Sequence, residues 1–228
     1  MKDDALSKLG GTCSILAGLI LVAGAPVLAL APREQQVDPA TCHCADSFLT
    51  SVAHSSTLLN TSFGLLALAQ ILGIAAVLAL SARVLAVHEG WVRWTSTLAI
   101  IGLALNAIDL LRLMALLSSI AAAYVHGDAA VKAALTAPGA LQSSDPQGWF
   151  KFGGFGLWVL VVSLLALRAG NGSRLLGALG IVIALSGWGV VAGELAQSQS
   201  LVLIPGGAFA ILTIVWYIWQ GLRLRRAG

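Results

Sequence analysis

The sequence predicts an all-α fold: a polytopic transmembrane helical bundle of six spans with both termini cytoplasmic. Three observations predict it. Hydrophobic residues make up 58% of the chain and charged residues only 10%, far from the composition of water-soluble domains. Six apolar stretches approach or exceed the roughly 20 residues that cross about 30 Å of hydrocarbon. Basic residues gather in the loops on one side of these stretches.

We expect the spans, taken in order, at residues 9–31, 58–82, 94–122, 152–167, 175–196 and 201–222, within one integral membrane domain over residues 1–228. The first ends in an Ala-x-Ala pattern like a signal-peptidase site. We expect it to be retained, because its apolar run exceeds the roughly 7 to 15 residues of a signal core and cleavage would fall directly before Pro32. Cleavage would leave five spans in the same orientation. The third is long enough to tilt or protrude, and the fourth, the shortest, extends back through "KFGG".

Orientation follows from the basic residues, which favour the cytoplasmic side of short loops. One side collects nine of them and the other only three, Arg33, Lys132 and Lys151. The loops 32–57, 123–151 and 197–200 are therefore expected outside, in a multi-pass protein of the bacterial cytoplasmic (inner) membrane. Because this asymmetry accounts for the net charge of +3, the sequence indicates contact with the lipid bilayer and no nucleic-acid surface. The nine residues are Lys2, Lys8, Arg83, Arg93, Arg168, Arg174, Arg223, Arg225 and Arg226.

Two charges interrupt the third span, in "NAIDLLRLM" at residues 106–114. A charge at the centre of a spanning helix costs about 2.5 to 3.5 kcal/mol on insertion scales, so it needs a partner. Asp109 and Arg112 stand three residues apart with the acid first, a spacing that lets the two side chains bridge. Asn106 extends the same stripe by one turn. We expect the stripe to face protein or water, with Asp109 near the middle of the membrane.

Other spans carry polar or indole side chains at matching depths. Together with the charged stripe they predict a ligand-binding pocket open to the outer face. An internal clasp that only fixes helix packing is the alternative, and the sequence leaves both open. The candidate ligand-binding residues are Asn60, Gln70, Asn106, Asp109, Arg112, Trp158, Ser186 and Trp188.

A second constellation is "CHCADS", with Cys42, His43 and Cys44 in an outer loop and His54 ten residues further on. Thiolates and imidazoles suit Cu(I) or Zn²⁺. Structural zinc sites, however, usually separate their cysteines by two to four residues. A disulfide and two free thiols are the other interpretations, and we expect no tight metal binding.

Catalytic motifs are lacking in the sequence. We find no Ser-His-Asp order, no phosphate loop, no HExxH helix and no cofactor motif, so no nucleophile and base can be named and the sequence leans against an enzyme. The outer loop around Asp128 to Leu135 has a helical pattern, and we expect a short helix on the outer surface there.

The C-terminal half resembles a bacterial six-span family of unknown function, domain of unknown function 4386. Its marks here are the aromatic and glycine-rich start of the fourth span, "GWFKFGGFGLW", the short inner turn "RAGNGSR" and the final "YIWQGLRLRR". Family members also carry Arg and Glu three apart in the third span, whereas "IDLLRL" reverses the order and uses Asp. The resemblance covers most of the chain from Leu58 and implies fold and topology but no chemistry. The Cys-His-Cys loop is not part of the pattern.

Two classes of function follow. In the first, the outer pocket binds or transports a small molecule, with Arg112 holding an anionic group and Asp109 orienting Arg112 or carrying a proton. In the second, the protein is a membrane scaffold or accessory subunit whose ion pair is structural, with a membrane protein or another copy as its partner. A metal or redox role of the outer loop is a further alternative.

Overall fold

A computed structural model describes residues 2–35, 45–137, 143–169 and 173–226. Within these ranges all regular structure is helical, and six helices are long and apolar enough to cross a membrane. The predicted all-α fold with six spans is confirmed, and the chain is a multi-pass membrane protein.

The long helices begin and end close to the expected bounds. They are α1 (Lys2–Ala29), α3 (Thr57–Val84), α4 (Glu89–His126), α6 (Phe155–Arg168), α7 (Arg174–Leu195) and α8 (Gln199–Arg226). The π-helix η2 (Trp149–Gly154) runs directly into α6, so the fourth span begins at Trp149, before "KFGG". Shorter elements are the 3₁₀ helix η1 (Arg33–Gln35), α2 (Ala45–His54) and α5 (Ala129–Thr136).

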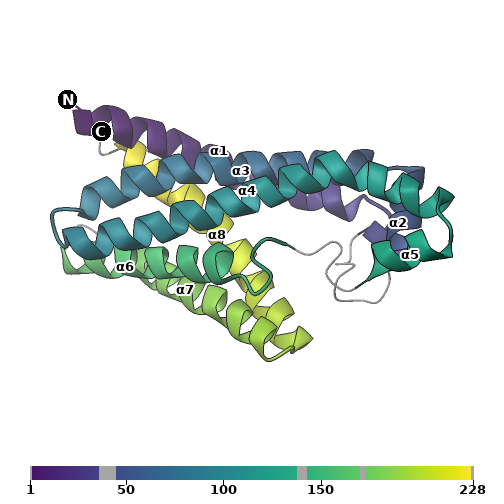
Figure 1. Cartoon of the computed structure of the whole chain (residues 1–228). Coiled ribbons are helices and arrows are strands. Elements are labelled where there is room, and N and C mark those ends of the chain that lie inside the picture. Colours follow the sequence, from purple (N-terminus) through teal and green to yellow (C-terminus); the bar gives the residue numbers. More distant parts are fainter. Residues whose placement is uncertain (1, 36–44, 138–142, 170–172, 227–228) are drawn as a thin grey trace.

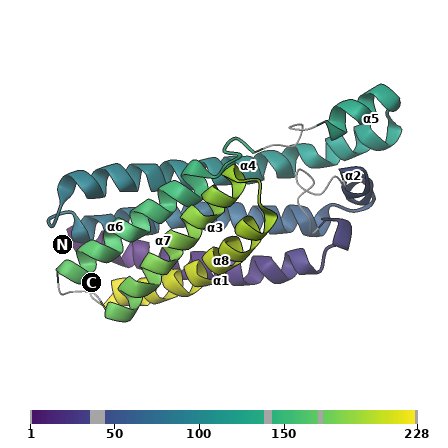
Figure 2. The same ribbon diagram turned by 90° about the horizontal axis from the view of Figure 1, so that it is seen from below.

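The six long helices form a closed ring. Each packs on two neighbours in the circular order α1, α3, α4, α6, α7, α8, and α8 returns to α1. Both termini lie at the same end of the bundle (Figure 1), which we call the proximal end. The opposite end, where α3 begins and α4 ends, is the distal end (Figure 2).

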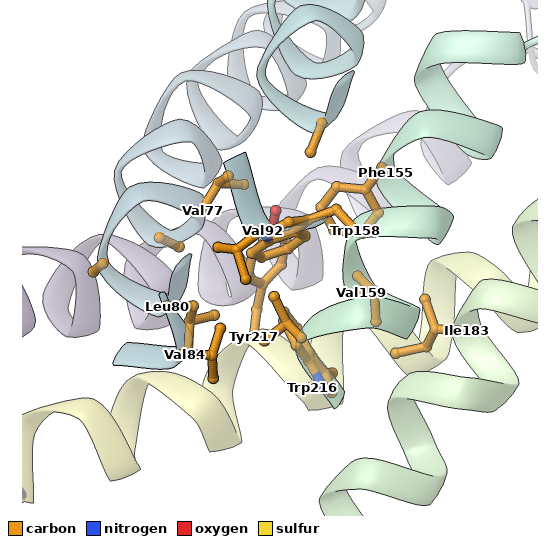
Figure 3. Packing of buried hydrophobic residues seen from close by; sticks show 14 of the residues in the cluster. Val77, Leu80, Val84, Val92, Phe155, Trp158, Val159, Ile183, Trp216 and Tyr217 are labelled. Atoms are coloured by element: carbon orange, nitrogen blue, oxygen red, sulfur yellow. The ribbon is translucent and has the colours of Figure 1, made fainter. Parts of the chain in front are cut away.

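Aromatic side chains of α6 and α8 fill the centre of the ring. Trp158 and Trp216 are fully buried and meet edge to face, with their ring centroids 5.7 Å apart. Phe155 and Tyr217 extend this cluster, and aliphatic side chains of α3, α4 and α7 surround it (Figure 3). The indole Nε1 of Trp158 donates a hydrogen bond to Ser81 Oγ over 2.9 Å. A buried polar group in an apolar layer is thereby satisfied.

Glycines bring α1 against both of its neighbours. A Cβ on Gly10 would lie 2.1 Å from Ala79 Cβ of α3, and one on Gly11 would lie 2.9 Å from the Gly221 carbonyl oxygen of α8. Because lipid tails are as apolar as side chains, helices in a bilayer associate mainly through such close van der Waals contact between small residues.

Helix α4 is longer than the helices that it packs against. Its 38 residues span about 57 Å, nearly twice a hydrocarbon core, and its last turns extend past the distal end of α6 and α7 (Figure 1). Helix α2, to which the sequence analysis assigned no helix, packs there through Phe48, Leu49 and Val52. Helix α2 thus covers part of the end of α4, and α5 follows α4 in the chain.

The short outer helix predicted around residues 128–135 is present as α5. The Asp128 side chain caps it by accepting a hydrogen bond from the Val131 N–H over 2.9 Å. The third span is longer than expected at both ends, since α4 begins at Glu89 and ends at His126.

We predict that Gly10→Ala destabilises the detergent-solubilised protein by about 1 to 3 kcal/mol, because the added methyl group would overpack the contact between α1 and α3. Thermal unfolding measures this. Gly207→Ala is the matched control, since nothing lies within 4 Å of the position its Cβ would take. Equal midpoints for the two variants would show that α1 does not pack on α3 in this way.

Candidate functional site

Asp109 of α4 is buried and accepts four hydrogen bonds from one short segment of the chain. Its Oδ2 atom accepts from Lys151 Nζ at 2.6 Å, from Ser143 Oγ at 2.7 Å and from the Ser144 N–H at 3.1 Å. Its Oδ1 atom accepts from Ser144 Oγ at 2.6 Å. We call these four residues the Asp109 clasp, because they tie α4 to the start of the fourth span.

The predicted pairing of Asp109 with Arg112 is wrong. The salt bridge of Asp109 is with Lys151, whose side chain is 11% exposed, and no salt bridge joins Asp109 to Arg112, although the structure describes both. Three residues turn a helix by about 300°, which leaves the two side chains about 60° apart around the axis. Asp109 faces the fourth span, and Arg112 is exposed.

Asp109 stands 20 residues after Glu89, about 30 Å along the 38 residues of α4. Its salt bridge with Lys151 places it level with the first turn of the fourth span.

The segment before the fourth span is held in shape by Asp145. Its carboxylate accepts hydrogen bonds from the N–H groups of Trp149, Phe150 and Lys151, over 3.0, 2.8 and 2.9 Å. The first N–H groups of a helix have no partner within the helix, and an aspartate at this position satisfies them. Gly148, with a φ of 72°, makes the turn. This local structure places the ammonium group of Lys151 against the carboxylate of Asp109.

A close backbone contact sets how η2 lies on α4. A Cβ on Gly102 of α4 would lie 2.1 Å from the Phe150 carbonyl oxygen, so only glycine fits there. The π-helical turn is marked by the Gly153 N–H, which donates to the Gly148 carbonyl oxygen five residues earlier. Such single turns recur at functional sites and displace the helix that follows them.

The structure disperses the other predicted ligand-binding residues. Trp158 belongs to the central cluster, whereas Trp188 is partly exposed and packs edge-on against Trp149 of η2. Asn60 donates to Ser56 Oγ at the distal end. Half-buried positions are held by Gln70, Asn106 and Ser186.

Among the cavities in the described part of the chain are two of about 500 Å³ each, and none of the eight predicted residues lines either of these. The first lies at the proximal end, between α1, α3, α6, α7 and α8. The second lies at the distal end, where α2, α3 and α4 meet, and His54 and His126 are among its lining residues. That the eight residues bind a ligand therefore stays a prediction.

The candidate metal ligands Cys42, His43 and Cys44 lie outside the described residues. His54 ends α2, is exposed, and has Nδ1 2.8 Å from the Thr50 carbonyl oxygen. In the described ranges no three His, Cys, Asp or Glu side chains gather as a metal site would require.

Lys151 is the functional residue that the sequence analysis missed. It was counted only as an outer basic residue, although it stands at the start of the fourth span with an acid at a similar depth in the third. The capping sequence "SSDPQGW" before it was a usable signal, because Ser and Asp followed by Gly and an apolar run indicate a fixed helix start.

Comparison with known proteins confirms the resemblance. Residues 12–224 match the family model described as Domain of unknown function (DUF4386). No curated protein and no solved structure matches the chain.

We predict that Asp109→Asn and Lys151→Met each destabilise the solubilised protein by about 3 kcal/mol or more, because each leaves the remaining charge buried without its partner. The double variant should be more stable than the less stable single variant. Thermal unfolding of all four proteins measures the coupling.

Arg112→Leu is the control for this cycle and should leave the unfolding midpoint nearly unchanged, since Arg112 is exposed and does not pair with Asp109. Additive effects of the two clasp substitutions, or a large loss in the control, would contradict the pairing.

Proposed function

Since this chain belongs to the family described as Domain of unknown function (DUF4386), we propose its role from geometry: a membrane scaffold or accessory subunit whose ion pair fixes the helix arrangement. The observation that carries the proposal is the occupied carboxylate of Asp109. All four of its hydrogen-bond donors come from residues 143–151 of the same chain.

A scaffold needs one rigid arrangement, and the clasp favours one. Charge-assisted hydrogen bonds are about twice as strong as neutral ones, and Asp109 receives one of them from Lys151 and three more from two serines. A pathway that moved a ligand past this point would have to break these bonds in every cycle. Fixing the start of the fourth span on α4 is therefore the simplest role for the pair.

Binding or transport of a small, anionic molecule in an outward-facing pocket is the competing proposal. It is supported by the exposed guanidinium of Arg112 and the half-buried Asn106 on the same helix as Asp109. The two proposals differ in one physical respect. A pocket admits water to the stretch around Asn106, whereas a closed scaffold does not.

We also propose that the proximal end faces the cytoplasm, in the inner membrane of a bacterium. The nine basic residues that the sequence places on one side of the membrane all belong to the proximal ends of the long helices. Trp91 and Trp94, at the proximal end of α4, are exposed. Basic residues on the cytoplasmic side and tryptophans at the interface are typical of inner-membrane proteins.

We predict that a cysteine at position 106 stays unlabelled in the scaffold. The experiment uses Asn106→Cys in a background without the three native cysteines, treated from outside with a membrane-impermeant maleimide. Gln147→Cys, at an exposed position in the segment before the fourth span, is the matched control and should react fully. Reaction at position 106 as fast as at position 147 would replace the scaffold proposal with the pocket.

We predict the orientation by the same chemistry in intact cells. Arg174→Cys and Arg226→Cys should be protected from the impermeant reagent until the membrane is permeabilised, because both positions belong to the proximal end. Ala130→Cys in α5 should react at once. Immediate labelling at position 174 would reverse the proposed threading.

A further inference from the structure

The proximal cavity lies at the other end of the bundle from the Asp109 clasp. Its volume of about 500 Å³ is within the range of small-molecule sites, roughly 300 to 1,000 Å³. Five helices contribute to its walls, so it is part of the bundle and not a gap beside a single loop. None of the groups proposed above for the scaffold takes part in it.

Two arginines from different helices line this cavity, Arg83 of α3 and Arg223 of α8. Arg83 is held in place because its Nε donates to Ser7 Oγ over 3.4 Å and its Nη2 donates to the Leu224 carbonyl oxygen over 3.3 Å. In the described ranges no carboxylate forms a salt bridge with Arg83, although Asp4 lines the same cavity. Anions are thus favoured beside Arg83.

Other parts of the cavity wall are apolar. Leu80 lies one turn into α3 from Arg83, and Val162 and Leu176 form the walls from α6 and α7. Ser163, only 3% exposed, also lines the cavity, and its hydroxyl has no hydrogen-bond partner in the described part of the chain. The cavity wall therefore combines two arginines, several apolar side chains and the Ser163 hydroxyl, which has no hydrogen-bond partner in the described residues.

We propose that this cavity binds the phosphate group of an anionic lipid, with the phosphate between Arg83 and Arg223 and the start of the acyl chain against Leu80, Val162 and Leu176. A guanidinium matches phosphate oxygens through paired N–H donors, and a tetrahedral phosphate offers oxygens in different directions to cations that come from two helices. Basic pockets between membrane helices are a known setting for such headgroups.

The apolar wall distinguishes a lipid from free phosphate. Inorganic phosphate would satisfy the arginines and leave Leu80, Val162 and Leu176 uncovered. An amphiphile covers both parts and also gains the free energy of removing apolar surface from water. We therefore expect the lipid to bind more tightly than the phosphate group alone.

The experiment uses the full purified chain in detergent and titrates dihexanoyl phosphatidylglycerol, dihexanoyl phosphatidylcholine and inorganic phosphate, with binding followed by native mass spectrometry. The anionic lipid should bind about tenfold more tightly than the zwitterionic one, a difference of about 1.4 kcal/mol. Arg83→Gln should abolish that preference, because it removes a charged donor from the cavity. Arg83→Lys, which keeps the charge, should retain part of it.

Arg168→Gln is the matched control, because Arg168 lies at the same end of the bundle but does not line the cavity. Its preference should equal that of the wild type. An anionic preference that survives Arg83→Gln, or is lost equally in the control, overturns the proposal. Inorganic phosphate that competes as well as the short-chain lipid also overturns it in favour of a soluble phosphate ligand. None of these outcomes depends on the clasp, so the scaffold proposal is tested separately.

Discussion

A charged side chain in an apolar layer must find its counter-charge inside the protein, and this constraint organises the bundle around Asp109. The acid is on the third span and its cation, Lys151, is at the start of the fourth. The salt bridge forms only if the fourth span begins at a fixed position beside α4. Asp145, which accepts hydrogen bonds from the first N–H groups of η2, and Gly148, which makes the turn before it, set that position.

The rest of the ring is held by shape more than by charge. Gly10, Gly11 and Gly102 let their helices approach the backbone of a neighbouring helix at places where a methyl group would not fit. The aromatic side chains of α6 and α8 then fill the space that the ring encloses. Contacts of this kind are short in range and sensitive to a single methylene, so they favour one arrangement of six helices over its alternatives.

The two ends of the bundle consequently differ in what they can do. At the level of Asp109 both carboxylate oxygens accept hydrogen bonds from the chain itself, which favours rigidity over exchange with a ligand. At the proximal end, Arg83 and Arg223 face a cavity with an apolar interior. The proposed scaffold role therefore rests on the level of Asp109, and the proposed lipid site rests on the proximal cavity.

The sequence by itself determined the helical class, the number of spans and most of their bounds, because length and apolarity are properties of each segment alone. It also identified Asp109 as a residue in need of a partner. Only the tertiary structure decided which partner that is, since Lys151 is 42 residues away in the chain and reaches Asp109 because one helix packs on another. A spacing of three residues made Arg112 a local candidate, but burial depends on which face of α4 meets its neighbour, and that face is set by the packing of the whole ring.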